Sequence, residues 1–550
     1  MRLLRLENDG GFSLVEFIGR DIPPYAILSH TWGADHEEVT FRDLIEGTGK
    51  NKAGYCKLTL CAKQAAHDGL QFFWVDTCCI DKSSSAELSE AINSMFRLYK
   101  DSAVCYVYLS DLRPSTDLST ALKGCRWFTR GWTLQELIAP NNSDFFNQNW
   151  EFVGSKRDLL DEISSITNIS TLVLSHNTPL SCVAVATRMS WAAHRHTTKV
   201  EDISYCLLGM FNINMPLIYG EGSKAFARLQ EEIIKGTCDL SIFAWKTVPG
   251  QDDQHSHQYS GILTESPRQF SSCGRLVQSK ERRFHADFSV TNRGVRIPTG
   301  LIASPIENFQ GYRYILCLDC STEDQSHVGI GLYLRKCGAD LFVRDQPSLL
   351  AIITPELRYR YRSRTIYVVS KLPERPDLTQ DGPTQGIDFI ISNRVSAIRI
   401  SLPPGLRTFN ATPVSHYDSQ DAVFFSTEIT HEGWCSIFIK GKLNLYGRRI
   451  PVSCFFACCG WNSESGYLVS TLADLSMCDP SSFERLVSEL EREQNDFMPW
   501  ALSNLNQFGI PMQDSVTLAD GAVRMSHVAK KAFLPNICKN GMYHVNVFLD

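Results

Sequence analysis

The side chains best suited to chemistry lie in three short stretches within the first 140 residues. They are Ser29, His30, Trp32 and Gly33 in the first stretch, Asp76, Cys78 and Cys79 in the second, and Trp132 and Glu136 in the third. Carboxylate and imidazole groups can bind the hydroxyls of a sugar, and a carboxylate can also stabilise positive charge that develops on a sugar ring. An indole can stack on a planar ring of a ligand. If the fold brings the stretches together, they predict a small-molecule pocket.

The first two stretches each follow an apolar run of the kind that forms a buried strand. Residues 25–29 and 72–76 are two such runs, and residues 103–109 form a third. Amphipathic helices are predicted between them, at 54–67 and after a capping box at 84–87. This alternation predicts an α/β domain with a doubly wound, flavodoxin-like parallel sheet, in which ligands bind at the carboxyl ends of the strands.

The third stretch, residues 130–140, is predicted to form a short helix that begins after Gly131 and ends before Pro140. Its tryptophan and leucines would form an apolar face that packs on the sheet. Two interpretations of Glu136 follow from this pattern. It is either a solvated residue on the outer face of the helix or the carboxylate of the pocket.

Composition narrows the class of protein. The net charge is -6 and no long Lys/Arg run is present, which argues against binding to nucleic acid. No apolar run approaches the roughly 18 residues that span a bilayer, and charged residues interrupt the first ten positions. We therefore expect a cytoplasmic protein whose 19 cysteines are reduced thiols.

The sequence gives little support for a metal site. Cys317 and Cys320 have the spacing of a ligand pair, but they lie within an apparent strand and no second pair follows at zinc-finger distance. We therefore expect no metal ion and no resident cofactor.

Three regions are predicted along the chain. Residues 1–153 form the α/β domain, and residues 154–245 form a helical extension that packs on it. A hydrophilic linker at 249–258 precedes a β-rich, sandwich-like region at 259–550. A long loop at 371–386 is predicted to divide this last region into two halves.

Three blocks of the sequence resemble the HET domain of fungal heterokaryon incompatibility proteins. They are Tyr-Ala-Ile-Leu-Ser-His-Thr-Trp-Gly at 25–33, Trp-Val-Asp-Thr-Cys-Cys-Ile-Asp-Lys at 74–82 and Arg-Gly-Trp-Thr-Leu-Gln-Glu-Leu at 130–137. The resemblance implies a role in vegetative incompatibility, a form of fungal allorecognition and innate immunity in which the HET domain triggers programmed cell death. It also implies partners, either a second copy of the chain or another signalling protein.

The HET domain is in turn similar to TIR domains, and this similarity implies roles for single residues. Ser29 and Gly33 match the end of the first TIR strand, and Trp132 and Glu136 match the TIR pattern Trp-Cys-x-x-Glu, with Thr133 in place of the cysteine. In TIR enzymes this glutamate cleaves NAD. The resemblance therefore implies that Glu136 is catalytic and that NAD is a substrate, with Ser29, His30, Trp32, Gly33, Asp76, Cys78 and Trp132 around it.

Two alternatives to an NAD glycohydrolase remain at this point. Many TIR domains associate without cleaving anything, which allows a non-enzymatic adaptor for death signalling. Cys78 or Cys79, with His30 as the base, also allows a cysteine hydrolase.

Overall fold

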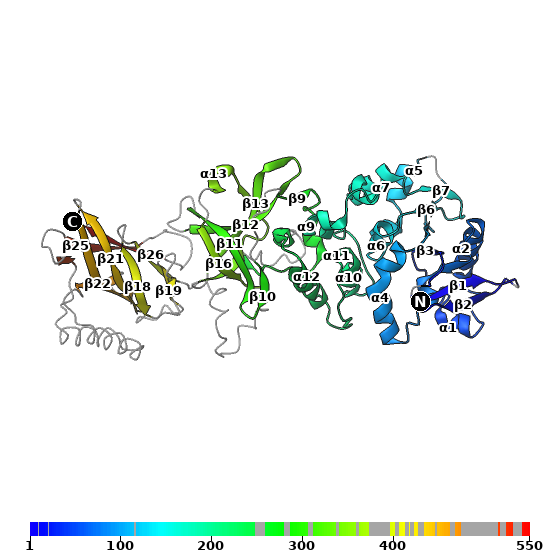
Figure 1. Cartoon of the computed structure of the whole chain (residues 1–550), viewed down its shortest axis with the longest axis horizontal. Coiled ribbons are helices and arrows are strands. Elements are labelled where there is room, and N and C mark those ends of the chain that lie inside the picture. The colour runs from blue at the N-terminus through cyan, green and yellow to red at the C-terminus, as the bar shows by residue number, and fades with distance from the viewer. Residues whose placement is uncertain are drawn as a thin grey trace.

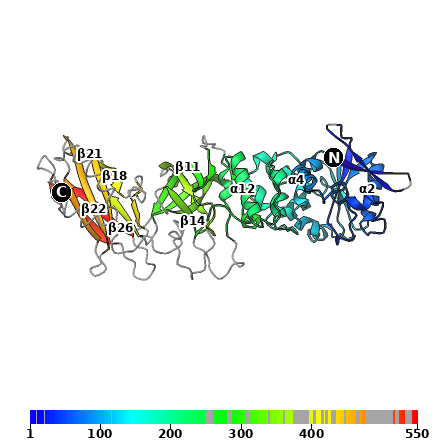
Figure 2. The same ribbon diagram turned by 90° about the horizontal axis from the view of Figure 1, so that it is seen from below.

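The computed structural model describes most of the chain up to residue 372 and a set of strands beyond it. The described residues are 1–247, 259–279, 287–305, 312–336, 340–358 and 362–372, apart from 9, 20, 115 and 116, together with the strands between 396 and 549. A seven-stranded sheet with its helices, a helical segment and a first β-sheet follow one another along the long axis (Figure 1). Figure 2 shows the same succession from below, with the N-terminal hairpin at one end.

The first domain is built on one mixed sheet. Its strands are β1 (Arg2–Leu6), β2 (Phe12–Glu16), β3 (Tyr25–His30), β4 (Phe72–Trp74), β5 (Val104–Tyr108), β6 (Ser143–Phe146) and β7 (Phe152–Ser155). They lie in the order β2-β1-β4-β3-β5-β6-β7, and the central strands β4, β3, β5 and β6 are parallel. The prediction of a wholly parallel sheet is wrong at both edges, where β1, β2 and β7 pair antiparallel. Short loops join β1 to β2 and β6 to β7, and such loops cannot make a parallel crossover.

Helices cover both faces of this sheet. The hydroxyl of Tyr25 in β3 donates a 2.6 Å hydrogen bond to the carbonyl of Leu98 in α4 (Ser85–Lys100). The hydroxyl of Tyr106 in β5 donates a 2.6 Å hydrogen bond to Asp68, which follows α2 (Tyr55–His67). Figure 1 places α2 on one side of the strands and α4 on the other. The α/β class is therefore confirmed, with the parallel strands in the chain order second, first, third, fourth that is typical of flavodoxin-like sheets.

Five further helices are described in this domain. Two of the predictions made for this part of the chain are wrong in detail. The helices are α1 (Phe41–Ile45), α3 (Asp76–Cys79), α5 (Leu118–Lys123), η1 (Arg126–Thr129) and α6 (Thr133–Ile138). The strand predicted at 72–76 stops at Trp74, and Asp76 begins a helix. Ser84 caps α4 as predicted, but the Glu87 carboxylate binds Arg2 and the backbone of Asp81, so the capping box is only half made.

A helical segment follows the sheet and packs against it. Its helices are α7 (Leu160–Thr167), α8 (Thr171–Leu174), η2 (Leu180–Cys182), α9 (Val185–Ser190), α10 (Asp202–Tyr205), α11 (Leu208–Phe211), α12 (Lys224–Gly236) and η3 (Leu240–Phe243). The side-chain amide of Asn93 in α4 donates to the carbonyl of Met215 at 3.3 Å and accepts from its backbone N–H at 3.1 Å. Gly209 in α11 lies so close to Phe96 that a Cβ there would meet the phenylalanine Cβ at 2.0 Å. These contacts join α11 and the loop after it to α4.

The C-terminal region is β-rich, as predicted. Its first sheet consists of β8 (Tyr259–Ser260), β9 (Leu276–Gln278), β10 (Ser289–Thr291), β11 (Gly294–Pro305), β12 (Tyr312–Thr322), β13 (Gln325–Lys336), β14 (Leu341–Asp345), β15 (Ala351–Ile353) and β16 (Arg362–Val368), accompanied by η4 (Pro267–Phe270) and α13 (Pro355–Arg358). Two further sheets lie beyond it, with six strands in the order β19-β20-β17-β26-β25-β24 and four in the order β18-β21-β22-β23.

The strands of these two sheets are defined by their backbone hydrogen bonds. They are β17 (Ser396–Ser401), β18 (Leu406–Thr412), β19 (Tyr417–Asp418), β20 (Val423–Ser426), β21 (Trp434–Leu445), β22 (Arg448–Trp461), β23 (Leu468–Asp474), β24 (Ser515–Thr517), β25 (Arg524–Lys531) and β26 (Met542–Leu549). The loop predicted at 371–386 lies outside the described residues from 373 onward.

Most buried apolar side chains of the described residues form one core that runs from Leu3 in β1 to Val368 in β16, and two small clusters around Ile302 and Val343 are separate from it. This core includes side chains on both sides of the linker predicted at 249–258, such as Phe243 in η3 and Phe288, whose ring centres lie 5.9 Å apart. The linker itself lies outside the described residues. In the part of the chain that the structure describes, every helix is too short or too polar to traverse a lipid bilayer.

Candidate functional site

The helix that follows Gly131 brings Glu136 to the sheet. All six residues of α6 are buried, including Gln135 and Glu136, so the interpretation of Glu136 as a solvated surface residue is wrong. Gly131 allows the chain to enter α6 in close contact with its neighbours, since a Cβ there would meet the Thr197 Cγ2 at 2.5 Å. The helix ends at Ile138, two residues before Pro140.

Glu136 is hydrogen-bonded to the end of the first parallel strand. The hydroxyl of Ser29 donates a 2.5 Å hydrogen bond to Oε2 of Glu136, and it accepts a 2.8 Å hydrogen bond from the indole Nε1 of Trp127 in η1. An indole N–H can only donate, so the single proton of Ser29 must point to the carboxyl group. Ser29 therefore couples Trp127 to Glu136.

The surroundings of Glu136 favour its protonated form. Burial raises the pKa of Glu136 from 4.5 to about 8, because the charged form loses its solvation, and the negative charge of Asp76 acts in the same direction. Hydrogen bonds from Ser29 and Tyr99 and the charge of Arg130 offset this only in part. Glu136 is therefore a carboxyl group that titrates near neutral pH, which is a property of many catalytic acids and bases.

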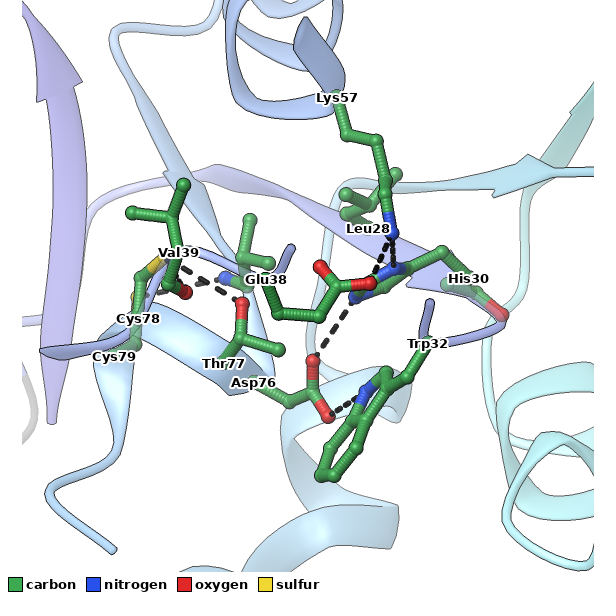
Figure 3. A network of polar contacts seen from close by, with 12 residues as sticks. Leu28, His30, Trp32, Glu38, Val39, Lys57, Asp76, Thr77, Cys78 and Cys79 are labelled. Atoms are coloured by element: carbon green, nitrogen blue, oxygen red, sulfur yellow. Dashed lines mark hydrogen bonds and ion pairs between the residues drawn. The ribbon is translucent and has the colours of Figure 1, made fainter. Parts of the chain in front are cut away.

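A second polar network lies around the next residue of β3, His30. Figure 3 shows the imidazole between Lys57 of α2 and Asp76 of α3, with 3.1 Å from the Lys57 Nζ to Nδ1 and 3.2 Å from Nε2 to the Asp76 Oδ1. A lysine ammonium can only donate, so Nδ1 accepts and the ring proton lies on Nε2, where it donates to Asp76. Both ring nitrogens of His30 are thus engaged by protein groups.

Lys57 and Trp32 extend this network. Lys57 also donates a 2.5 Å hydrogen bond to the Glu38 Oε1, which accepts a 2.6 Å hydrogen bond from the backbone N–H of Gly33. The indole Nε1 of Trp32 donates a 3.0 Å hydrogen bond to Oδ2 of Asp76, as Figure 3 shows. Burial alone would raise the pKa of Asp76, but the hydrogen bond from His30 and the charge of Lys82 outweigh it and lower the pKa to about 2. Asp76 is therefore a permanent anion at the rim of the sheet.

Trp32 is the exposed element of this network. It is 37% exposed, and the ammonium of Lys82 lies 3.7 Å from the centre of its ring. A cation above an indole is a favourable cation–π pair, so Lys82 covers part of the ring surface that a planar ligand would use.

The structure brings most of the predicted site residues to one end of the sheet, but in two groups. Successive side chains of a strand point to opposite faces, so Ser29 faces α6 while His30 faces α2. Trp132 belongs to neither group, because its indole Nε1 lies 3.4 Å from Asp202 in α10. The prediction of a single cluster around Glu136 thus becomes two neighbouring networks on either side of β3.

The two cysteines of the second stretch are packed rather than activated. The Cys78 thiol donates a 3.1 Å hydrogen bond to the carbonyl of Val39, and burial raises its pKa to about 12. Burial also raises the pKa of the Cys79 thiol well above its usual range. A nucleophilic cysteine needs a thiolate and a free base, and His30 is already engaged by Lys57 and Asp76. This geometry gives no support to the cysteine hydrolase.

A third group of polar side chains lies where the chain order of the parallel strands reverses, between β3 and β5. The hydroxyls of Thr31 and Ser110 lie 3.4 Å apart, and the Arg126 guanidinium lies 3.5 Å from Thr31. The backbone N–H of Arg126 donates to Asp111 at 2.8 Å. Ligands of doubly wound sheets bind at such reversals, so these groups extend the rim on which Ser29 and His30 lie.

Several residues of the site escaped the sequence analysis. Trp127 and Tyr99 contact the Ser29–Glu136 pair, and Lys57 and Glu38 complete the His30 network. Lys57 was detectable in principle, as a cation on the helix that follows the first strand. The others gave no local signal, because each reaches the site only through tertiary packing.

Comparison with known proteins bears on this architecture. Residues 25–123 match the sequence model of the family described as heterokaryon incompatibility protein (HET), and residues 224–297 match a domain of unknown function, DUF8212. The vegetative incompatibility protein HET-E-1 of Podospora anserina is 50% identical over 299 residues, which make up 52% of this chain and 21% of that protein. The chain thus spans about a fifth of this curated relative. No solved structure shows a significant match. This chain therefore carries a heterokaryon incompatibility (HET) domain at residues 25–123.

Proposed function

We propose that this chain acts in vegetative incompatibility in the fungal cytoplasm, with its HET domain as the trigger of cell death. The match at residues 25–123 and the 50% identity to a vegetative incompatibility protein support this role. Activation proceeds by assembly, either with a second copy or with another signalling protein.

The reaction we propose for the HET domain is TIR-like hydrolysis of NAD, with Glu136 as the catalytic carboxylate. The observation that supports it is the pairing of Glu136 with Ser29 at the carboxyl end of β3, next to the reversal of the strand order. In this reaction water attacks C1′ of the ribose that bears nicotinamide, and the bond from C1′ to the ring nitrogen breaks. The bonding electrons neutralise the pyridinium nitrogen, so nicotinamide leaves without a proton. The attacking water forms the new bond to C1′ and releases one proton to the solvent.

The role of Glu136 in this step is electrostatic. Cleavage passes through a sugar ring with positive charge, which an ionised carboxylate beside the ribose stabilises. Glu136 has a pKa of about 8 and is 9% exposed, so the isolated chain is a resting state in which this carboxyl group is mostly neutral and covered. Assembly activates the enzyme by uncovering Glu136 and favouring its ionised form.

A non-enzymatic adaptor is the second candidate, and the burial of Glu136 is the observation that favours it. A buried, hydrogen-bonded carboxyl group can have a purely structural role, in which it holds α6 against β3. In this case the carboxyl group supports the fold, and signalling depends on surfaces elsewhere.

Measuring nicotinamide release from the concentrated full chain separates the two. If Glu136 is catalytic, Glu136→Gln lowers release about a hundredfold or more and abolishes cell killing, although the amide preserves shape and hydrogen bonding to Ser29. Thermal unfolding of both proteins provides the control for folding. Equal background release from wild type and Glu136→Gln, with killing retained in both, would exclude the enzyme and leave the adaptor.

A further inference from the structure

The helix that bears Glu136 is held at both ends by buried cations from the residues that follow it. At the C-terminal end, the Lys156 Nζ donates hydrogen bonds to the carbonyls of Leu137 at 3.3 Å and Pro140 at 2.5 Å. A cation is favourable there, because the last carbonyls of a helix carry partial negative charge. Lys156 therefore behaves as an ordinary stabilising partner of α6.

Arg195 lies at the N-terminal end of α6, where the partial charge of the helix does not explain the presence of a cation. Its Nη1 donates to the carbonyl of Arg130 at 2.8 Å and to the hydroxyl of Thr133 at 2.9 Å, and its side chain is buried. The N-terminal end of a helix carries partial positive charge and disfavours a cation. Burial of a guanidinium in this place is costly unless another group compensates.

Glu136 is the carboxyl group whose charge acts on this guanidinium. It lies three residues after Thr133 on the same side of α6, since residues at this spacing are neighbours on a helix surface. Burial lowers the pKa of Arg195 to about 10, and the neighbouring Cys206 and Glu136 both favour its charged form. The charges that act most on Glu136 itself are those of Asp76 and Arg130, so Arg195 adds its charge to theirs. The position of Glu136 depends on the start of α6, which Arg195 binds.

A chain of hydrogen bonds also joins the two residues. Thr133 accepts from Arg195, and its own hydroxyl lies 2.5 Å from the carbonyl of Trp127. Trp127 donates to Ser29, and Ser29 donates to Glu136. A thiol in place of the Thr133 hydroxyl would be a weak acceptor for a guanidinium, so threonine suits this contact.

We propose that Arg195 is a positioning residue for Glu136, which it serves by fixing the start of α6 through Thr133 and by adding a positive charge that favours the carboxylate. This inference rests on the proposed function of Glu136. It assigns a part of the site to the helical segment that follows the sheet, so the catalytic unit includes residue 195.

Three variants of the full chain test this proposal. Arg195→Met removes the charge and the hydrogen bonds, Arg195→Lys keeps the charge, and Thr133→Val keeps the shape but removes the acceptor. Arg188→Met is the matched control, because Arg188 is a buried arginine of the same segment that donates to the carbonyl of Met210. Nicotinamide release is measured against pH, and the infrared carboxyl band of Glu136, assigned by subtraction of the Glu136→Gln spectrum, is titrated in parallel.

We expect Arg195→Met to lower kcat by about tenfold to a hundredfold, as small misplacements of catalytic groups do. Its pH profile and the titration of the carboxyl band should both move to higher pH, and Arg195→Lys should restore most of this shift. Thr133→Val should lower kcat with a smaller shift, and Arg188→Met should change neither.

The proposal would be overturned if Arg195→Met and Arg188→Met gave the same pH profile of nicotinamide release and the same titration of the infrared carboxyl band. If Arg195→Met does not fold, Thr133→Val decides, and a wild-type kcat and carboxyl band in that variant would count against positioning. If the wild type releases no nicotinamide, the proposed reaction fails, but the titration of the band still tests the action of Arg195 on Glu136.

Discussion

The hydroxyl of Ser29 donates a 2.5 Å hydrogen bond to the carboxyl group of Glu136, and this contact joins the first parallel strand to a helix 107 residues later. Both groups are buried, so neither can exchange its partner for water without a change in the fold. The same contact places a titratable group at the ligand-binding end of the sheet.

We predict that Ser29→Ala destabilises the chain by about 1–3 kcal/mol, because the buried Trp127 Nε1 and Glu136 then lose a partner. The pKa of Glu136 should rise further, since the hydrogen bond from Ser29 lowers it. Urea unfolding measures the first effect and the infrared carboxyl band the second. Ser110→Ala, at an exposed position two residues after β5, is the control and should change the free energy of unfolding by less than about 0.5 kcal/mol.

The pH dependence of stability should reveal Glu136 independently of any activity. Its pKa is about 8 in the folded chain and close to 4.5 when unfolded, so between these values the folded state binds more protons. The contribution of Glu136 to the free energy of unfolding is therefore largest below pH 4.5 and is lost as the pH rises through about 8. Urea midpoints measured from pH 5 to 9 should fall less steeply in Glu136→Gln than in wild type. Parallel curves would contradict a raised pKa.

Activity should respond to pH in the opposite sense. An ionised Glu136 is the catalytic form in the proposed reaction, so nicotinamide release should increase with pH. Its midpoint should lie below the resting pKa of about 8, because assembly favours the ionised form. Initial rates at saturating NAD measure this dependence. A rate that is constant from pH 6 to 9 would mean that Glu136 does not titrate in the active state.

Asp76→Asn should destabilise the chain by about 1–3 kcal/mol at neutral pH, because the anion binds His30 and Trp32 through two hydrogen bonds. Its pKa is lowered to about 2, so the stability it provides is present above pH 3.8 and is lost as the pH falls through about 2. Urea unfolding at pH 7 measures the loss. Asp324→Asn, which affects an exposed pair with Arg275, should cost less than about 1 kcal/mol.

Two glycines at the ends of short helices, Gly131 before α6 and Gly124 after α5, offer a matched pair. Gly131→Ala should destabilise the chain by about 1–3 kcal/mol, because the new Cβ would meet Thr197 at 2.5 Å and Cys206 at 3.2 Å. Gly124→Ala introduces a Cβ whose nearest neighbour is a carbonyl oxygen at an ordinary 3.5 Å, and it should be close to neutral. Thermal melting of both variants compares them directly. Equal losses would show that the start of α6 can adjust.

Alkylation tests the packed state of the cysteine pair. Under native conditions Cys56, Cys182 and Cys238 are exposed and should react with iodoacetamide, whereas the buried Cys78 and Cys79 should not. Mass spectrometry of tryptic peptides identifies the modified residues. Rapid labelling of Cys78 at pH 7 would revive the cysteine hydrolase.

Local patterns predicted the elements of the first domain well. The strand at Tyr25–His30 and the helix at Tyr55–His67 follow directly from apolar runs and helical spacing. The antiparallel edges were missed because β1 and β2 are short and amphipathic, and their pairing depends on a hairpin turn rather than on a buried run. The site divides into two networks because Ser29 and His30 are consecutive in β3 and point to opposite faces of the sheet. The sequence shows this alternation, but it does not show which helix covers each face.

The burial of Glu136 could not be predicted from its own helix. The pattern of α6 gives it a polar position, yet that position faces Ser29 of β3, and Arg195 of the following helical segment binds the start of the helix. Information of this kind lies in contacts between residues far apart in sequence, which periodicity does not encode.

The interdigitation of Gly209 with Phe96, together with the paired hydrogen bonds between Asn93 and Met215, has a practical consequence for dissecting this protein. A fragment that stops after the seventh strand would leave α4 stripped of its cover and prone to aggregate, so toxicity or inertness measured on it would reflect a damaged molecule. Truncation series should keep the chain intact at least through residue 368, because the buried core that contains η3 continues into β16.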